Sequence, residues 1–181
     1  MSRTVLTART SVLRVLVPTA LAATALAWIV PPATASLFGP PWISIESPPN
    51  PHDRATRGAL LVVRTYHHGD QVDQGVRGTA EGLEGTERRT VKLDFQKASQ
   101  SGVYALRRQW PAEGRWVLVI STGGSTDAGD GATALVSLDG RGQVASVTVP
   151  TRQQDGWSVP RAVTAAEVNA LLRASVAYAG R

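Results

Sequence analysis

The chain of 181 residues contains no cysteine, and this absence removes several chemistries at once. Without thiols the protein has no disulfide framework, no thiolate metal site and no cysteine nucleophile. Met1 is the only methionine, so the chain also lacks a methionine-rich metal motif. Its stability must come from a packed hydrophobic core, and a chain of this length is long enough to form one.

Acidic residues are missing from the first 35 positions, where three arginines lie, Arg3, Arg9 and Arg14. The whole chain has 19 basic and 14 acidic residues, so much of the basic excess belongs to this segment and the rest is close to neutral. A domain that binds nucleic acid usually carries clustered Lys and Arg. We therefore expect no nucleic-acid partner.

Residues 1–35 have the features of a secretory signal peptide. An apolar run from Val15 to Val30 follows the arginines, and Ala33 and Ala35 place small residues at the alternate positions that signal peptidase accepts. The alternative, a retained membrane anchor, is disfavoured because the run is shorter than the ~20 residues that cross a bilayer. The predicted product begins at Ser36, has no membrane span, and is exported to the periplasm or the extracellular space.

Short segments with the composition of β-strands follow the leader. They are Trp42–Glu46, Ala59–Tyr66, Val72–Ala80, Val91–Gln96, Val103–Trp110, Trp116–Ile120, Ala132–Leu138 and Gln143–Val149. Flanking prolines mark the first as an edge strand, and the unbroken apolar run of the sixth marks a central one. Asp139-Gly140 is a strong hairpin signal between the last two. Seven or eight strands at this spacing predict an all-β antiparallel sandwich.

A C-terminal α-helix is expected after a connector, residues 151–161. Thr164 and Glu167 form a capping box, and Val163 and Val168 are placed as its hydrophobic staple. Val168, Leu171, Leu172 and Ser175 share one face of a helix reaching about Tyr178, which should pack against the sandwich. The expected organisation is a signal peptide at 1–35, a Pro-rich segment with an edge strand at 36–58, the sandwich at 59–150, and connector and helix at 151–181.

The sharpest candidate for chemistry is a metal site at His67, His68 and Asp70, because imidazole and carboxylate groups bind copper or zinc. Neighbouring residues on a strand point to opposite faces, so both imidazoles reach one ion only if the turn folds them together. His52-Asp53 offers further ligands, although nothing in the sequence brings that loop near. The alternative interpretation is that these are polar turn residues.

Other patterns favour no particular chemistry. Asp127–Gly131 is one residue short of a calcium-loop spacing, and a solvated hairpin loop explains it equally well. Ser121 and Ser125 lie in a Gly-rich loop without the nucleophile-elbow pattern. The acidic residues Glu81, Glu84 and Glu87 are interpreted as part of a solvated loop. We therefore expect no catalytic residue, no cofactor and no enzymatic activity.

Two surface features are candidates for contacts. Arg88-Arg89 and Arg107-Arg108 form a basic face with Arg64 and Arg77 if their strands are neighbours, and such a face would receive an acidic partner or anionic lipid headgroups. The alternative is the ordinary polar side of a sandwich. Among the tryptophans of the strand region, Trp157 is the one expected to be exposed, whereas Trp42, Trp110 and Trp116 are expected in the core.

The stretch Gly102–Leu106 leading into Trp110–Val119 resembles the closing strands of small exported immunoglobulin-like domains of the YtkA-like class. Val76–Gly82 is similar to a strand of these domains or of carboxypeptidase regulatory-like domains. The resemblance covers about Leu60 to Ile120 and implies an immunoglobulin-like sandwich outside the cytoplasm. In some relatives this fold is associated with copper handling or with respiratory-complex assembly. Since no Met-rich or His-rich motif is present, the copper association transfers poorly.

These observations together predict an exported, non-enzymatic immunoglobulin-like accessory or interaction module that binds another protein of the cell envelope. The alternative is a periplasmic copper- or zinc-binding protein that uses His67, His68 and Asp70. A third hypothesis, a hydrolase, is disfavoured because spacing identifies no nucleophile with its base.

Overall fold

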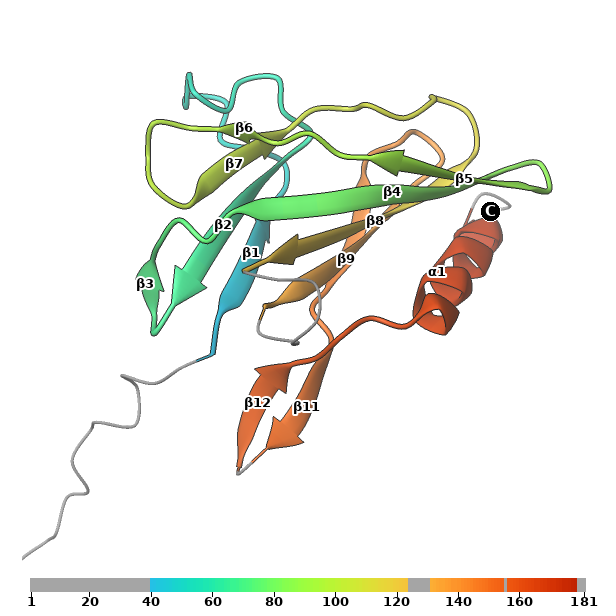
Figure 1. Cartoon of the computed structure of the whole chain (residues 1–181). Helices are drawn as coiled ribbons and strands as arrows, with labels where there is room; N and C mark the ends of the chain where they lie inside the picture. The colour runs from blue at the N-terminus through green and yellow to red at the C-terminus, as the bar shows by residue number, and fades with distance from the viewer. Residues whose placement is uncertain (1–39, 124–130, 155, 179–181) are drawn as a thin grey trace, which may run out of the picture. The chain divides into compact units, whose positions relative to one another are not determined.

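Two antiparallel β-sheets lie face to face in the computed structural model, which describes residues 40–123, 131–154 and 156–178 (Figure 1). The first sheet has the order β1-β2-β7-β6, with β3 beside β2. Its strands are β1 (Trp42–Glu46), β2 (Leu61–His67), β3 (Asp70–Gln71), β6 (Gln96–Lys97) and β7 (Val103–Leu106). The predicted edge strand Trp42–Glu46 is confirmed at one end of this sheet.

The second sheet has the order β10-β9-β8-β4-β5. Its strands are β4 (Val76–Glu84), β5 (Glu87–Lys92), β8 (Arg115–Thr122), β9 (Thr133–Leu138) and β10 (Val144–Thr148). The apolar run predicted as a central strand is β8, which pairs with β4 on one side and β9 on the other. The predicted hairpin of the last two strands is formed, but its turn is longer than Asp139-Gly140, since the Gly142 N–H donates to the Asp139 carbonyl at 2.9 Å.

This strand order is that of an immunoglobulin domain. Such domains place strands A, B, E and D in one sheet and C and its neighbours with F and G in the other. The first sheet matches A-B-E-D through β1, β2, β7 and β6, and the second matches C′-C-F-G through β5, β4, β8 and β9. The predicted all-β sandwich is therefore confirmed, with β3 and β10 as additions to the core strands.

The core lies between the sheets and combines residues of both. Ile43, Leu61 and Val63 come from the first sheet and face Ala80, Leu118 and Ile120 of the second, with Tyr104, Leu106, Trp110 and Trp116 in the same cluster. All ten side chains are at most 6% exposed. Leu93 and Phe95 also pack on this cluster, although their segment lies beyond the end of β5 at Lys92 and carries the chain from one sheet to the other.

A helix covers the outer face of the second sheet. α1 (Ala165–Tyr178) packs Val168 and Leu172 against Val117 of β8 and Leu135 of β9. These two strands are therefore buried on both faces, which explains their continuous apolar sequences. The side chain of Ser175, predicted on the same helix face, is outside the described part of the chain. No helix in the described residues has both the length and the apolar character needed to cross a membrane.

The predicted capping box begins this helix. The Thr164 N–H donates to Glu167 Oε2 at 2.9 Å, and the Glu167 N–H donates back to Thr164 Oγ1 at 3.3 Å. Arg161 holds the same carboxylate with two donors, Nη1 at 3.0 Å and Nη2 at 2.5 Å. Arg161 and the bonds to Thr164 lower the pKa of Glu167 to about 2. The entry to the helix is thus tied to the chain before it.

The acidic stretch predicted as a solvated loop is instead part of β4 and β5, so that prediction was wrong. β4 continues through Gly82, which pairs with Trp116 of β8. A Cβ at Gly82 would lie 2.4 Å from Trp116 Cζ3, so the indole ring occupies the space above the glycine. The ring replaces the missing side chain, and for this reason glycine does not end the strand.

Candidate functional site

The predicted metal residues lie in the turn between β2 and β3. His67 is the last residue of β2 and pairs with Asp70, the first of β3. His68 adopts a left-handed conformation, φ 54°, and its ring centroid lies 3.9 Å from that of His67 at an interplanar angle of 61°. The turn therefore folds the two imidazole rings against each other.

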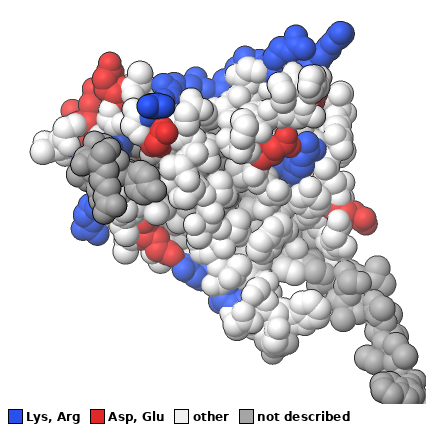
Figure 2. Space-filling model, turned by 180° about the vertical axis from the view of Figure 1, so that it is seen from behind, with Lys and Arg blue, Asp and Glu red and all other residues white. Residues whose placement is uncertain are grey.

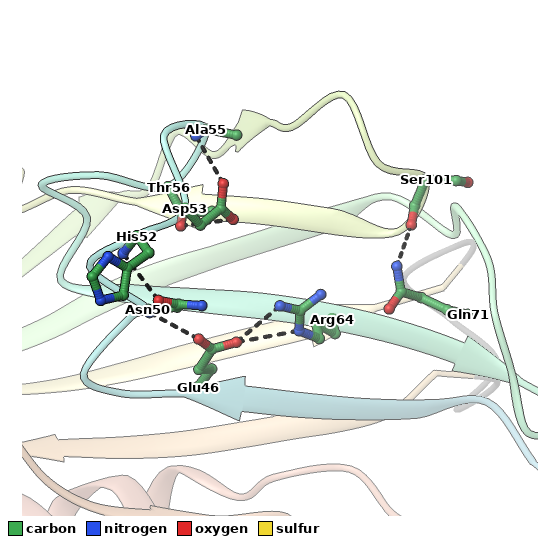
Figure 3. Close-up of polar contacts among 9 residues, drawn as sticks. All are labelled: Glu46, Asn50, His52, Asp53, Ala55, Thr56, Arg64, Gln71 and Ser101. Atoms are coloured by element: carbon green, nitrogen blue, oxygen red, sulfur yellow. Dashed lines mark hydrogen bonds and ion pairs between the residues drawn. The ribbon is translucent and has the colours of Figure 1, made fainter.

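The residues proposed as further ligands lie elsewhere. Figure 3 shows His52 beside Glu46, where β1 ends, and the His52 N–H donates to Asn50 Oδ1 at 3.0 Å. Glu46 pairs with Val62, so this loop is about 17 Å along β2 from His67 at ordinary strand rise. Within the described residues, no group of three or more His, Asp and Glu side chains is placed to hold a metal ion.

The segment after β3 is anchored by one carboxylate. Asp73 accepts hydrogen bonds from the Tyr104 hydroxyl and from Lys97 Nζ, and its Oδ1 also accepts the Gly75 N–H at 3.3 Å. The bond from Lys97 is the main reason that the pKa of Asp73 falls to about 2, and burial together with Asp73 raises the pKa of Tyr104 to about 12. Gln71 Nε2 donates to the Ser101 carbonyl at 2.6 Å (Figure 3). These bonds hold the chain on the β3 side of the histidine turn.

The remaining candidates are distributed over the molecule. Ser121 Oγ lies 2.9 Å from Thr133 Oγ1, on the neighbouring strand. Ser125 and most of the predicted calcium loop fall outside the described residues. Glu81 Oε2 accepts from Thr90 Oγ1 at 2.8 Å and pairs with Arg88 at 3.4 Å.

The single basic face proposed from the sequence is not formed. Arg64 belongs to the first sheet and pairs with Glu46 at 2.9 Å, whereas Arg88 and Arg89 lie on the edge strand of the second. Arg89 pairs with Glu84 at 3.0 Å. Each of these charges meets a carboxylate of its own sheet, so their strands do not present one common cationic surface.

An unpredicted hairpin occupies most of the connector. β11 (Thr151–Gln154) and β12 (Trp157–Pro160) pair with each other and with neither sheet. Six of the eight strand residues are exposed, and Trp157 exposes 53% of its surface. Asp155-Gly156 is the same dipeptide signal as in the other hairpin, so the sequence did contain a sign of this turn.

A hollow of about 450 Å³ lies beside this hairpin, and we call it the hairpin groove. It is lined by Pro40, Pro41, His67, Gly131, Arg152, Gln154, Val159 and Pro160. Next to Pro41, Trp42 is 36% exposed, which corrects its predicted place in the core. The start of β1, the histidine turn and the hairpin thus meet around one hollow with a mixed polar and apolar lining.

Comparisons of the chain with protein-family models, with curated proteins and with solved structures find no match. Function must therefore be inferred from the surface of the molecule itself.

Proposed function

We propose that this protein is an exported, non-enzymatic immunoglobulin-like module of the cell envelope, and that it binds another envelope protein through the hairpin β11–β12 and the hairpin groove. The observation that carries the proposal is the exposure of Trp157 on a hairpin that joins neither sheet. The signal-peptide features of residues 1–35 support export. The strand order supports an immunoglobulin-like module, a class that often binds partners through its loops.

Tryptophan is suited to this role by its size and chemistry. Its ring buries a large apolar area while its indole N–H still meets a polar partner, and such residues dominate many interfaces. On the face of the hairpin that carries Trp157, the exposed polar residues are its cross-strand partner Gln154 and Arg152, whose Nη2 donates to Gln154 Oε1 at 3.0 Å. An apolar anchor within a polar rim is the usual composition of a transient protein interface.

The test is crosslinking in the native envelope. A photoreactive amino acid at position 157 should capture one reproducible partner, whereas the same group at Gln100, an exposed residue of another loop, should not. Trp157→Ala should weaken recovery of that partner by about tenfold or more, as expected for an interface anchor, while Gln100→Ala should leave recovery unchanged. Equal capture from both positions, or none from position 157, would remove the basis of the proposal.

A second candidate function is binding of copper or zinc, and the adjacent rings of His67 and His68 favour it. His67 also lines the hairpin groove, which gives an ion access from solvent. Titration with each metal should quench tryptophan fluorescence at a fixed stoichiometry, and His67→Ala and His68→Ala should abolish the response. His52→Ala is the matched control because it removes an imidazole at the far end of β2. A response that also disappears in His52→Ala, or that never saturates, argues against this site.

A further inference from the structure

A second hollow, of about 400 Å³, lies where the loop before β2, the end of β7 and the β9–β10 turn meet. Its lining comprises Pro48, Pro49, Gly58, Ala59, Leu60, Arg108, Arg141 and Gln143, and we call it the arginine pocket. No acidic residue is among these. Segments far apart in the sequence thus bring basic and apolar groups together around a space large enough for a small ligand.

Arg108, which lines this pocket, and its neighbour Arg107, which lies against the lining residue Gly58, are both held by neutral acceptors. Arg108 Nη2 donates to the carbonyl oxygens of Arg141 at 3.1 Å and Gly142 at 3.0 Å. Arg107 Nη2 donates to the Arg57 carbonyl at 2.8 Å, beside Gly58. Carbonyl oxygens orient a guanidinium without neutralising its charge.

Glycines leave the space that the guanidinium groups of Arg107 and Arg108 occupy. Gly58 has φ 76° and Gly142 has φ 73°, a region that other residues rarely adopt. A Cβ at Gly58 would lie 2.9 Å from Arg107 Nη1, and one at Gly142 would lie 1.6 Å from Arg108 Nη2. Each guanidinium therefore lies directly on a glycine, and a side chain at either glycine would displace it.

Within the described residues, no ion pair neutralises the charge of these arginines, whereas four other arginines do pair with carboxylates. Arg64, Arg88, Arg89 and Arg161 each form an ion pair with a glutamate. Within the described part of the chain, Arg107, Arg108 and Arg141 form none. The nearest carboxylate to Arg141 in sequence, Asp139, accepts the backbone N–H groups of Arg141 and Gln143, both at 2.8 Å. Figure 2 shows basic side chains gathered along an edge of the molecule.

We propose that the arginine pocket binds a phosphate group carried by a small molecule or a lipid. Phosphate suits it better than a peptide carboxylate, because the tetrahedral arrangement of phosphate oxygens accepts hydrogen bonds from several guanidinium groups at once, and a phosphate monoester also carries more charge. The bonds to Arg141 and Gly142 use only Nη2 of Arg108, so Nε and Nη1 still face no partner in the described residues. Pro48, Pro49 and Leu60 provide an apolar wall for the organic part of the ligand. This proposal does not depend on the hairpin groove or its partner.

Calorimetric titration of the purified protein tests the proposal. The probes are inorganic phosphate, glycerol 3-phosphate and a glutamate-rich peptide, and vesicles of phosphatidylcholine with and without phosphatidylglycerol test the lipid source by sedimentation. We expect one saturable phosphate site whose affinity falls as salt rises, since the pocket is open to solvent. Binding to glycerol 3-phosphate in solution would assign a soluble ligand, and binding only to phosphatidylglycerol vesicles would assign a lipid headgroup.

Arg141→Gln is the principal variant, because in the described structure the Arg141 side chain makes no bond whose loss would unfold the protein. It should weaken phosphate binding by about tenfold, the effect of losing one charge-assisted donor. Arg108→Gln should do the same, and its melting temperature shows whether the β9–β10 turn survives. Arg173→Gln, an exposed arginine on α1, is the matched control and should bind normally. An absence of binding to inorganic phosphate, to glycerol 3-phosphate and to phosphatidylglycerol vesicles alike, an equal loss in Arg173→Gln, or tighter binding of the glutamate-rich peptide would each overturn the proposal.

Discussion

The Tyr104 hydroxyl donates a hydrogen bond to the Asp73 carboxylate, and this bond joins the loop after β3 to the buried strand β7. Lys97 from the adjacent strand β6 donates to the other oxygen of the same carboxylate. The arrangement lowers the pKa of Asp73 to about 2 and raises that of Tyr104 to about 12. The bond is strongest when Asp73 is ionised and Tyr104 is protonated.

This pairing predicts a stability difference that depends on pH. Asp73 contributes stability above its ordinary pKa of 3.8, and that contribution is lost as pH falls towards about 2. Tyr104 contributes below its ordinary pKa of 10.0, and that contribution is lost as pH rises towards about 12. Asp73→Asn and Tyr104→Phe should therefore melt below the unaltered protein, most clearly between these limits. A difference that is the same at all pH values would show that the bond is not responsible.

The stability of α1 depends on the hydroxyl group of Thr164, which forms part of the capping box. Thr164→Ala removes the oxygen that accepts the Glu167 N–H, and should lower the free energy of unfolding by about 1 kcal/mol. The Glu167 contribution is present above its ordinary pKa of 4.5 and is lost as pH falls towards about 2. Denaturant unfolding of Thr164→Ala and of Arg173→Ala, which lies away from the cap, measures the difference. Equal effects of the two changes would contradict this account.

Removal of one side chain should detach the helix from the second sheet. Leu172 is 1% exposed and packs with Val117 and Leu135, so Leu172→Ala should cost about 3 kcal/mol through lost burial and the cavity that remains. Hydrogen exchange should then increase first in α1, which is the outermost element of this cluster. Leu171→Ala, at a half-buried position beside it, should cost less.

The contact between Gly82 and Trp116 predicts that adding a methyl group at position 82 lowers the free energy of unfolding. Gly82→Ala would place a Cβ 2.4 Å from the Trp116 ring, so the indole must move and about 2 kcal/mol of stability should be lost. The tryptophan emission should shift because a buried ring becomes partly solvated. Gly140→Ala is the control, since no atom lies within 4 Å of its added Cβ and its effect should be near zero.

Patterns carried by neighbouring residues predicted much of the fold. The edge strand β1, the central strand β8 and the capping box of α1 all depend on alternation, apolar runs or spacing within a few residues. The prediction that acidic residues near Gly82 form a loop failed because the strand there is completed by Trp116, which lies on another strand. A local pattern does not contain that contact.

The candidate surfaces were predictable only in part. The exposure of Trp157 followed from its polar surroundings, whereas the exposure of Trp42 was missed because strand position alone does not show what covers a side chain. His67 and His68 were recognised from composition, but their ring contact required the left-handed turn at His68. Arg107 and Arg108, which follow β7, were expected to share a basic face with arginines of other strands. The structure instead bonds them to backbone carbonyl groups of loops.

The sequence by itself determined the sandwich class and the capped helix, because strand alternation and helix capping are short-range effects of side-chain size and hydrogen bonding. Tertiary structure alone decided which carbonyl groups hold Arg107 and Arg108, and which groups meet at the hairpin groove. Those groups come from loops separated by tens of residues, whose meeting depends on how the two sheets pack. The contacts on which the proposed binding surfaces rest are therefore long-range ones.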